Sequence, residues 1–171
     1  MESRSPCGYS KMKQWFLVDH LEVERLLLEW RWLCPQRMTL VARSAFGDLF
    51  LRNEAGIVFW LDTDVGKLTE VAHSETQFLE LAETSEKRRE WFAEPELQAA
   101  AARGLDPTST QCIGFSVPLV FAESGSPDTS YVADLCEYVS FLGDLNRQIS
   151  GLPDGTKIKL QVRPPKASPS Q

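Results

Sequence analysis

The chain has 171 residues, of which 43% are hydrophobic and 25% are charged, so it fits one globular domain and is not disordered throughout. Eighteen Lys and Arg residues are outnumbered by twenty-four Asp and Glu residues, which gives a net charge of −6. Because nucleic-acid binding needs a basic surface that releases counterions, this balance argues against direct nucleic-acid binding. Residues 45–151 alone carry a net charge of −11, so the acid is concentrated in the middle of the chain.

The sequence carries no sign of a membrane or export segment. No stretch approaches the roughly 20 apolar residues that span a bilayer, and the N-terminal residues lack the apolar core of a signal peptide. These features predict a cytoplasmic protein without a membrane partner. The four cysteines lie far apart and form no C-x-x-C pair, which favours reduced thiols over a zinc site. We therefore expect no metal and no cofactor.

Composition divides the chain into three parts. Residues 1–12 are polar and are predicted to be flexible, and residues 164–171 have the composition of a disordered tail. Residues 13–163 are predicted to form a single domain.

The first predicted element of this domain is a helix over about residues 19–33. Apolar residues recur there at three- and four-residue steps, which places them on one helical face, and Pro35 ends the pattern. Asp19 and Glu22 have the spacing of a capping box at the start of this helix.

The next segments are typical of short strands. They cover about residues 40–42, 49–51, 57–61 and 67–71, and short polar loops that contain or end in glycine separate the later ones. Segments of this kind predict an antiparallel meander, which is the clearest structural unit in the sequence.

Helical patterns return at Ser74, which forms a capping box with Gln77. A second helical stretch runs over about residues 85–103, and Pro95 requires that the chain break there and begin a new helix. Gly104 is placed to cap its C-terminus.

The last part of the domain mixes strand and helix signals. Residues 112–117 and 131–139 are predicted to be strands, residues 142–149 a short helix, and residues 158–162 an edge strand protected by lysines and arginine. The sequence as a whole predicts an α+β fold, a single domain in which an antiparallel meander sheet is packed with helices.

Signatures of enzymes are scarce. The common nucleotide-binding, zinc-protease and hydrolase motifs do not occur. His20 and His73 both lie beside predicted helix starts, where solvated or capping roles are simpler than catalysis. The segment 62–64 resembles the opening of a calcium loop, but the twelfth position holds His73 in place of the required glutamate. We therefore predict a non-enzymatic protein, and a small hydrolase built on carboxylates such as Asp48 and Asp62 is the weakest alternative.

Four acidic residues fall within or beside the turns of the predicted meander: Asp48, Glu54, Asp62 and Asp64. We expect some of them to share one rim of the sheet. An acidic rim can steer a basic partner and block its nucleic-acid site, although ordinary solubility charge also explains such residues.

Five segments, in this order along the chain, resemble a known bacterial family: residues 30–33 (WRWL), 44–51 (SAFGDLFL), 58–62 (VFWLD), 111–118 (QCIGFSVP) and 142–149 (LGDLNRQI). The family is the C-terminal domain of type VI secretion immunity proteins of the Tdi type, and the resemblance covers about residues 20–158. A resemblance to the SUKH immunity superfamily is weaker. The resemblance implies a non-enzymatic protein that binds and neutralises a secreted toxin, in that family a DNA-degrading one.

The residues and the resemblance together predict an immunity protein whose partner is a cognate toxin. Its contacts with the toxin are predicted to include Asp48, Glu54, Asp62 and Asp64, with neighbouring apolar side chains as anchors. The main alternative is a ligand-binding or scaffold module, with a pocket between the helix at residues 19–33 and the sheet.

Overall fold

The structure is a computed structural model of the chain, and it describes residues 15–17, 23–121, 129–153 and 155–159. The predicted flexible segment at residues 1–12 and the predicted tail at residues 164–171 lie outside the described residues.

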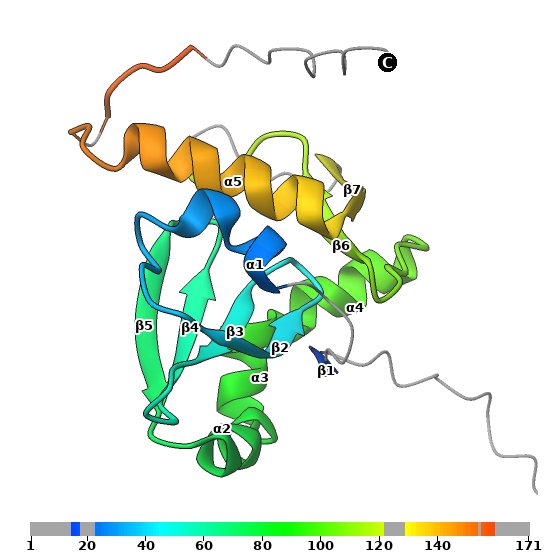
Figure 1. The fold of residues 1–171 in the computed structure, drawn as a ribbon. Coiled ribbons are helices and arrows are strands. Elements are labelled where there is room, and N and C mark those ends of the chain that lie inside the picture. Colours follow the sequence, from blue (N-terminus) through cyan, green and yellow to red (C-terminus); the bar gives the residue numbers. More distant parts are fainter. Residues whose placement is uncertain (1–14, 18–22, 122–128, 154, 160–171) are drawn as a thin grey trace, which may run out of the picture.

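A five-stranded antiparallel sheet forms the centre of the molecule, and its strands follow one another in chain order (Figure 1). The predicted meander is confirmed, and one strand that the sequence did not predict is added at its start. The strands are β1 (Trp15–Leu17), β2 (Thr39–Ser44), β3 (Leu49–Arg52), β4 (Val58–Asp62) and β5 (Lys67–Ala72).

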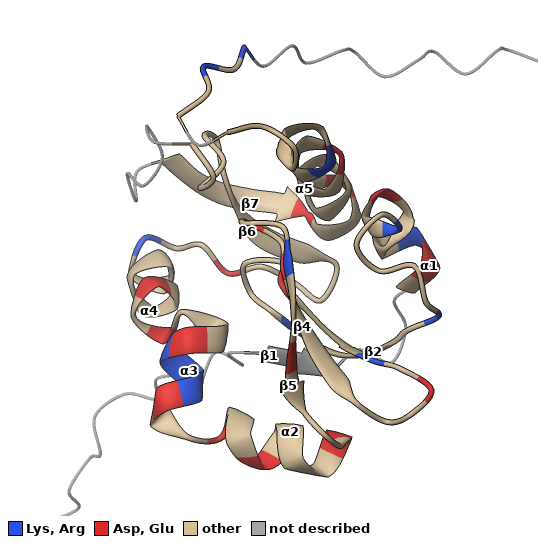
Figure 2. Ribbon diagram, turned by 90° about the vertical axis from the view of Figure 1, so that its left-hand side faces the viewer, with Lys and Arg blue, Asp and Glu red and all other residues tan. Residues whose placement is uncertain are grey.

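Helices cover both faces of this sheet, and the predicted α+β fold, an antiparallel meander packed with helices, is confirmed. Figure 2 shows the sheet between one helical layer and another. Because successive strand residues point to opposite faces, Leu49 and Leu51 pack toward the first layer, whereas Phe50 between them packs toward the second. The first layer contains α1 (Val23–Leu26), the 3₁₀ helix η1 (Leu28–Trp30) and α5 (Leu135–Ile149).

The helix predicted over residues 19–33 is shorter and tighter than expected. Among residues 23–33, the part of it that the structure describes, α1 and η1 are the only helical segments, and the predicted capping box of Asp19 and Glu22 lies outside the described residues. Leu26 and Trp30 are fully buried in one core cluster with Leu49 of the sheet. The core of the interface at which a ligand pocket was predicted is therefore packed with apolar side chains, and Trp32 of the same segment lines a hollow of about 790 Å³ together with Val65 of the β4–β5 turn.

The second layer confirms the predicted helices after Ser74. It contains α2 (Glu75–Ala82), α3 (Ser85–Phe92) and α4 (Glu94–Ala102). The Ser74 hydroxyl accepts the Gln77 N–H at 3.2 Å, and Pro95 occupies the first turn of α4. The break predicted from Pro95 occurs at Ala93, whose φ of 45° separates the two helices.

The prediction for residues 131–139 is wrong in its second half. The strand β7 (Ser130–Asp134) ends early, pairs with β6 (Gln111–Phe115), and gives way to α5. The Asp134 carboxylate caps α5 by accepting the Glu137 N–H at 3.0 Å. An aspartate followed by a glutamate three residues later is the spacing of a capping box, and this signal was missed.

The predicted edge strand at residues 158–162 is also wrong in its described part, because residues 156–159 form no strand.

The small β6–β7 sheet packs closely on α5. A Cβ atom at Gly114 would lie 2.8 Å from Cε2 of Tyr138, whose hydroxyl accepts the Phe115 N–H at 3.1 Å. We expect Gly114→Ala to lower the free energy of unfolding in urea by about 1 to 3 kcal/mol, because the ring must move. Gly151→Ala is the matched control, since a Cβ atom there meets nothing within 4 Å. Equal stabilities of the two variants would contradict this packing.

Two cysteines are inert parts of the core, in agreement with the predicted reduced thiols. Burial raises the pKa of Cys34 to about 11 and that of Cys112 to about 12. Since only the thiolate reacts, we expect iodoacetamide to label neither residue in the native protein at neutral pH and both in denaturant. Peptide mapping by mass spectrometry measures this directly, and rapid native labelling of either residue would refute the assigned burial.

Candidate functional site

Three of the four predicted acidic residues meet at one end of the meander. Successive turns of a meander lie at alternate ends, so the β2–β3 turn and the β4–β5 turn share an end. Asp48 lies in the first of these turns, whereas Asp62 and Asp64 belong to the second. Glu54 is exposed in the β3–β4 turn at the opposite end, so it cannot contribute to the same surface.

Hydrogen bonds within the fold occupy both carboxylate oxygens of Asp48. Its Oδ1 accepts the Thr63 N–H at 3.0 Å, and its Oδ2 accepts the Ser44 hydroxyl at 3.3 Å. The Ser44 oxygen in turn accepts the Asp48 N–H at 3.1 Å. Asp48 was predicted to contact a partner, but in the structure its carboxylate links the β2–β3 turn to the β4–β5 turn.

Asn146 of α5 also holds the β4–β5 turn, which contains Thr63. This buried residue of α5 donates from Nδ2 to the Thr63 carbonyl and to the Leu142 carbonyl, both at 3.0 Å. Gly66 follows with φ +68°, and a Cβ atom there would lie 2.7 Å from Oδ1 of Asn146. We call residues 62–66 the acidic turn, and its backbone is locked between Asp48 and α5.

Sequence reasoning singled out neither Thr63 nor Asn146. Thr63 is fully buried in a segment that had the composition of an ordinary polar turn. Asn146 lies on the buried face of an amphipathic helix, where a polar residue needs hydrogen-bond partners. A polar residue on this face predicts a buried hydrogen bond, but the sequence does not identify its partner, the Thr63 carbonyl, which lies 83 residues away.

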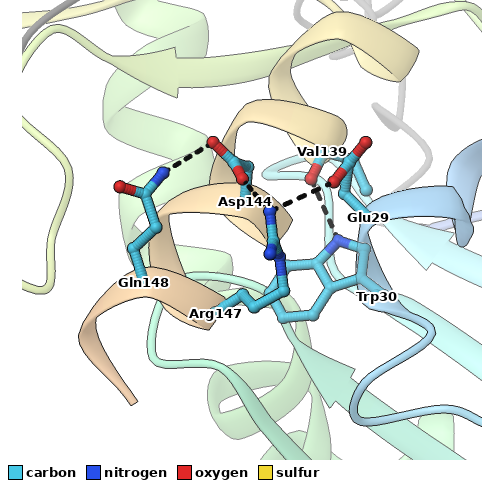
Figure 3. Close-up of polar contacts among 6 residues, drawn as sticks. All are labelled: Glu29, Trp30, Val139, Asp144, Arg147 and Gln148. Atoms are coloured by element: carbon cyan, nitrogen blue, oxygen red, sulfur yellow. Dashed lines mark hydrogen bonds and ion pairs between the residues drawn. The ribbon is translucent and has the colours of Figure 1, made fainter. Parts of the chain in front are cut away.

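The packing of α5 on η1 supports this arrangement (Figure 3). The indole N–H of Trp30 donates to the Val139 carbonyl at 2.9 Å. Arg147 forms an ion pair with Asp144 and reaches Glu29 at 3.9 Å. The helix that carries Asn146 is therefore held by both a buried hydrogen bond and surface charges.

Burial and mutual repulsion perturb the acidic cluster. Burial is the main cause that raises the pKa of Asp48 well above its ordinary value, and Asp64 and Asp62 add to it. Burial, with Asp62 second, raises the pKa of Asp64 to about 7. Among the described residues, Oδ1 of Asp64 is buried and has no hydrogen-bond partner. The pKa of Asp62 is also raised by burial, although the Val65 N–H opposes the shift.

The acidic turn is a ridge between two hollows, because Val65 at its tip lines both. One hollow, of about 510 Å³, has a mixed lining that includes Trp60, Lys67 and Glu70. The other, of about 790 Å³, is lined by polar and apolar surface in similar measure and reaches Trp32. A rigid charged ridge beside a hollow with exposed apolar side chains can bind a protein surface, because little of its own conformational freedom is lost on binding.

The described residues offer no metal centre. No group of three or more His, Cys, Asp or Glu side chains among them is arranged to hold a metal ion. Within the same part of the chain, no helix has both the length and the apolar character needed to cross a membrane.

Comparison with models of known protein families gives no match for this chain, and comparison with curated proteins gives none either. The relationship to the Tdi-type immunity domain therefore stays a prediction from the sequence.

Proposed function

We propose that this protein is a non-enzymatic immunity protein, which binds a cognate secreted nuclease toxin in the cytoplasm and covers its active site. The observation that carries the proposal is the acidic turn, held rigid by Asp48 and Asn146 between two hollows. The resemblance of five segments to Tdi-type immunity domains supports the same function.

The charge of the chain fits a nuclease as partner. A protein that binds DNA presents a basic surface to the phosphates. Residues 45–151 of this chain carry a net charge of −11, and Asp62 and Asp64 lie on the ridge of the acidic turn. Complementary charge of this kind accelerates association and favours the intended partner over others. Asp48 would act indirectly by positioning the turn, and Glu54 would lie outside the contact.

The first experiment asks whether the protein neutralises a toxin. The chain is co-expressed with the product of the adjacent gene, and both complex formation by pull-down and growth of the cells are measured. We expect a stable complex and full rescue of growth from toxicity. If the wild-type chain neither binds nor rescues, the proposed function fails.

A further inference from the structure

Exposed apolar residues are concentrated in one place. Seven large hydrophobic side chains are exposed among the described residues, and four of them line the hollow of about 790 Å³. These four are Trp32, Val65, Leu152 and Ile158, and we call this hollow the apolar groove. Four such side chains around one hollow offer apolar surface to a bound molecule, whereas single exposed apolar residues scattered over a surface are ordinary.

The acidic turn, α5 and the segment after α5 build the groove. Val65 and Gly66 of the acidic turn form one wall, the end of α5 contributes Asn146 and Ile149, and the residues from Ser150 to Ile158 that line it follow the helix. A Cβ atom at Gly66 would lie 2.7 Å from Oδ1 of Asn146, so there is no room for a side chain between the turn and the helix. The volume lies in the range, about 300 to 1,000 Å³, that accommodates several side chains of a bound molecule.

The charges beside the groove differ from those inside it. Asp62 and Asp64 precede Val65 in the acidic turn, and Asp62 lines the neighbouring hollow of about 510 Å³. The charged residue that lines the groove itself is Lys157, and α5 ends beside it at Ile149 with the partial negative charge of a helix C-terminus. A positive group is therefore favoured on the side of the acidic turn, and an apolar group in the groove itself.

We propose that the apolar groove receives an aliphatic or aromatic side chain of the toxin, and that an adjacent Lys or Arg of the toxin lies over Asp62 and Asp64. This inference rests on the proposed function and assigns its contact surface. The groove supplies the apolar anchor, and the acidic turn beside it selects a basic segment.

The test uses two pairs of exposed apolar residues. Leu152→Asn with Ile158→Asn makes the groove polar, whereas Tyr131→Asn with Phe141→Asn changes side chains of similar exposure that do not line it. We expect the groove variant to bind the adjacent-gene toxin at least about tenfold more weakly, and the control variant to bind within about twofold of wild type. Circular dichroism checks that both variants are folded.

A single position tests the charge preference. Val65 is 54% exposed at the tip of the turn, so either charge is tolerated there. We expect Val65→Lys to weaken toxin binding more than Val65→Glu, because the lysine repels the basic segment. Equal losses, or a larger loss for Val65→Glu, would overturn the assignment of a basic partner.

The outcomes separate this inference from the proposed function. If wild type and the groove variant bind and rescue equally, the groove assignment is overturned while the function stands. If wild type does not bind the toxin, a displayed library of random peptides is selected on the wild-type chain instead. Peptides that pair an apolar residue with Lys or Arg and lose affinity for the groove variant would support the groove. Peptides without basic residues, or unaffected by the variant, would overturn it.

Discussion

Gly66→Ala is expected to lower the free energy of unfolding by about 3 to 5 kcal/mol, the largest loss that we predict for a single methyl group in this chain. Gly66 has φ +68°, which costs an L-residue about 1 kcal/mol or more. The new Cβ atom would also lie 2.7 Å from Oδ1 and 2.9 Å from Cβ of Asn146. Asn146 cannot move away without losing its hydrogen bond to the Thr63 carbonyl.

Three further variants divide this cost into backbone strain and steric collision. Gly56→Ala is the matched control, because Gly56 has φ +87° but a Cβ atom there meets nothing within 4 Å. We expect it to cost only about 1 kcal/mol. Asn146→Ala alone should cost about 2 kcal/mol, because the Thr63 carbonyl loses its partner. In the double variant Gly66→Ala with Asn146→Ala, the collision is relieved, so the losses should sum to less than their single values.

Urea unfolding of these four variants and of wild type gives the free energy of unfolding of each, and thus the double-mutant cycle for Gly66 and Asn146. Strict additivity of the two losses, or equal losses for Gly66→Ala and Gly56→Ala, would contradict the locking of the acidic turn by α5.

The second large effect is a dependence of stability on pH that originates in Asp64. The pKa of Asp64 is about 7 in the folded protein, against an ordinary value of 3.8. The folded state therefore binds this proton more tightly than the unfolded state. Its contribution to stability is complete below about pH 4 and is lost as the pH rises from about 4 to about 7.

Asp64→Asn removes this titration. We expect the variant to be more stable than wild type by about 1 to 3 kcal/mol at about pH 8, and close to wild type at about pH 4. The control is Glu54→Gln, because Glu54 is exposed at the other end of the meander. Thermal unfolding across this pH range gives the difference between each variant and wild type. A constant difference between Asp64→Asn and wild type, or a larger stabilisation at low pH, would show that Asp64 is not perturbed in this direction.

The meander and the break at Pro95 could be predicted because their signals are local. Alternating side chains, glycine in tight turns and proline in a first helical turn each act on their own neighbours in sequence. The start of α5 was missed because β-rich residues before and after Asp134 outweighed the capping signal of Asp134 and Glu137. The helix at residues 19–33 was overestimated because periodicity reports a buried face and does not distinguish an α-helix from a 3₁₀ helix.

The candidate site was predicted in part. Counting turns along a meander places Asp48 and Asp62 at one end and Glu54 at the other, so the separation of Glu54 was available from the sequence. The inward role of Asp48 depends on Thr63, and the fixed position of Thr63 depends on Asn146 in α5. Contacts between such distant segments form only when the whole domain folds, and no local pattern encodes them.

The most direct test of the central claim, that the acidic turn recognises a basic toxin, is the association rate of the chain with the adjacent-gene toxin at several salt concentrations. Asp62→Asn with Asp64→Asn is compared with Glu54→Gln and with wild type by stopped-flow fluorescence at about pH 8, above the pKa of Asp64 of about 7, where its carboxyl group is mostly ionised. We predict that the double variant associates about tenfold more slowly at low salt, that this difference shrinks as salt rises, and that Glu54→Gln matches wild type. Equal rates and equal salt dependence for all three proteins would contradict the claim.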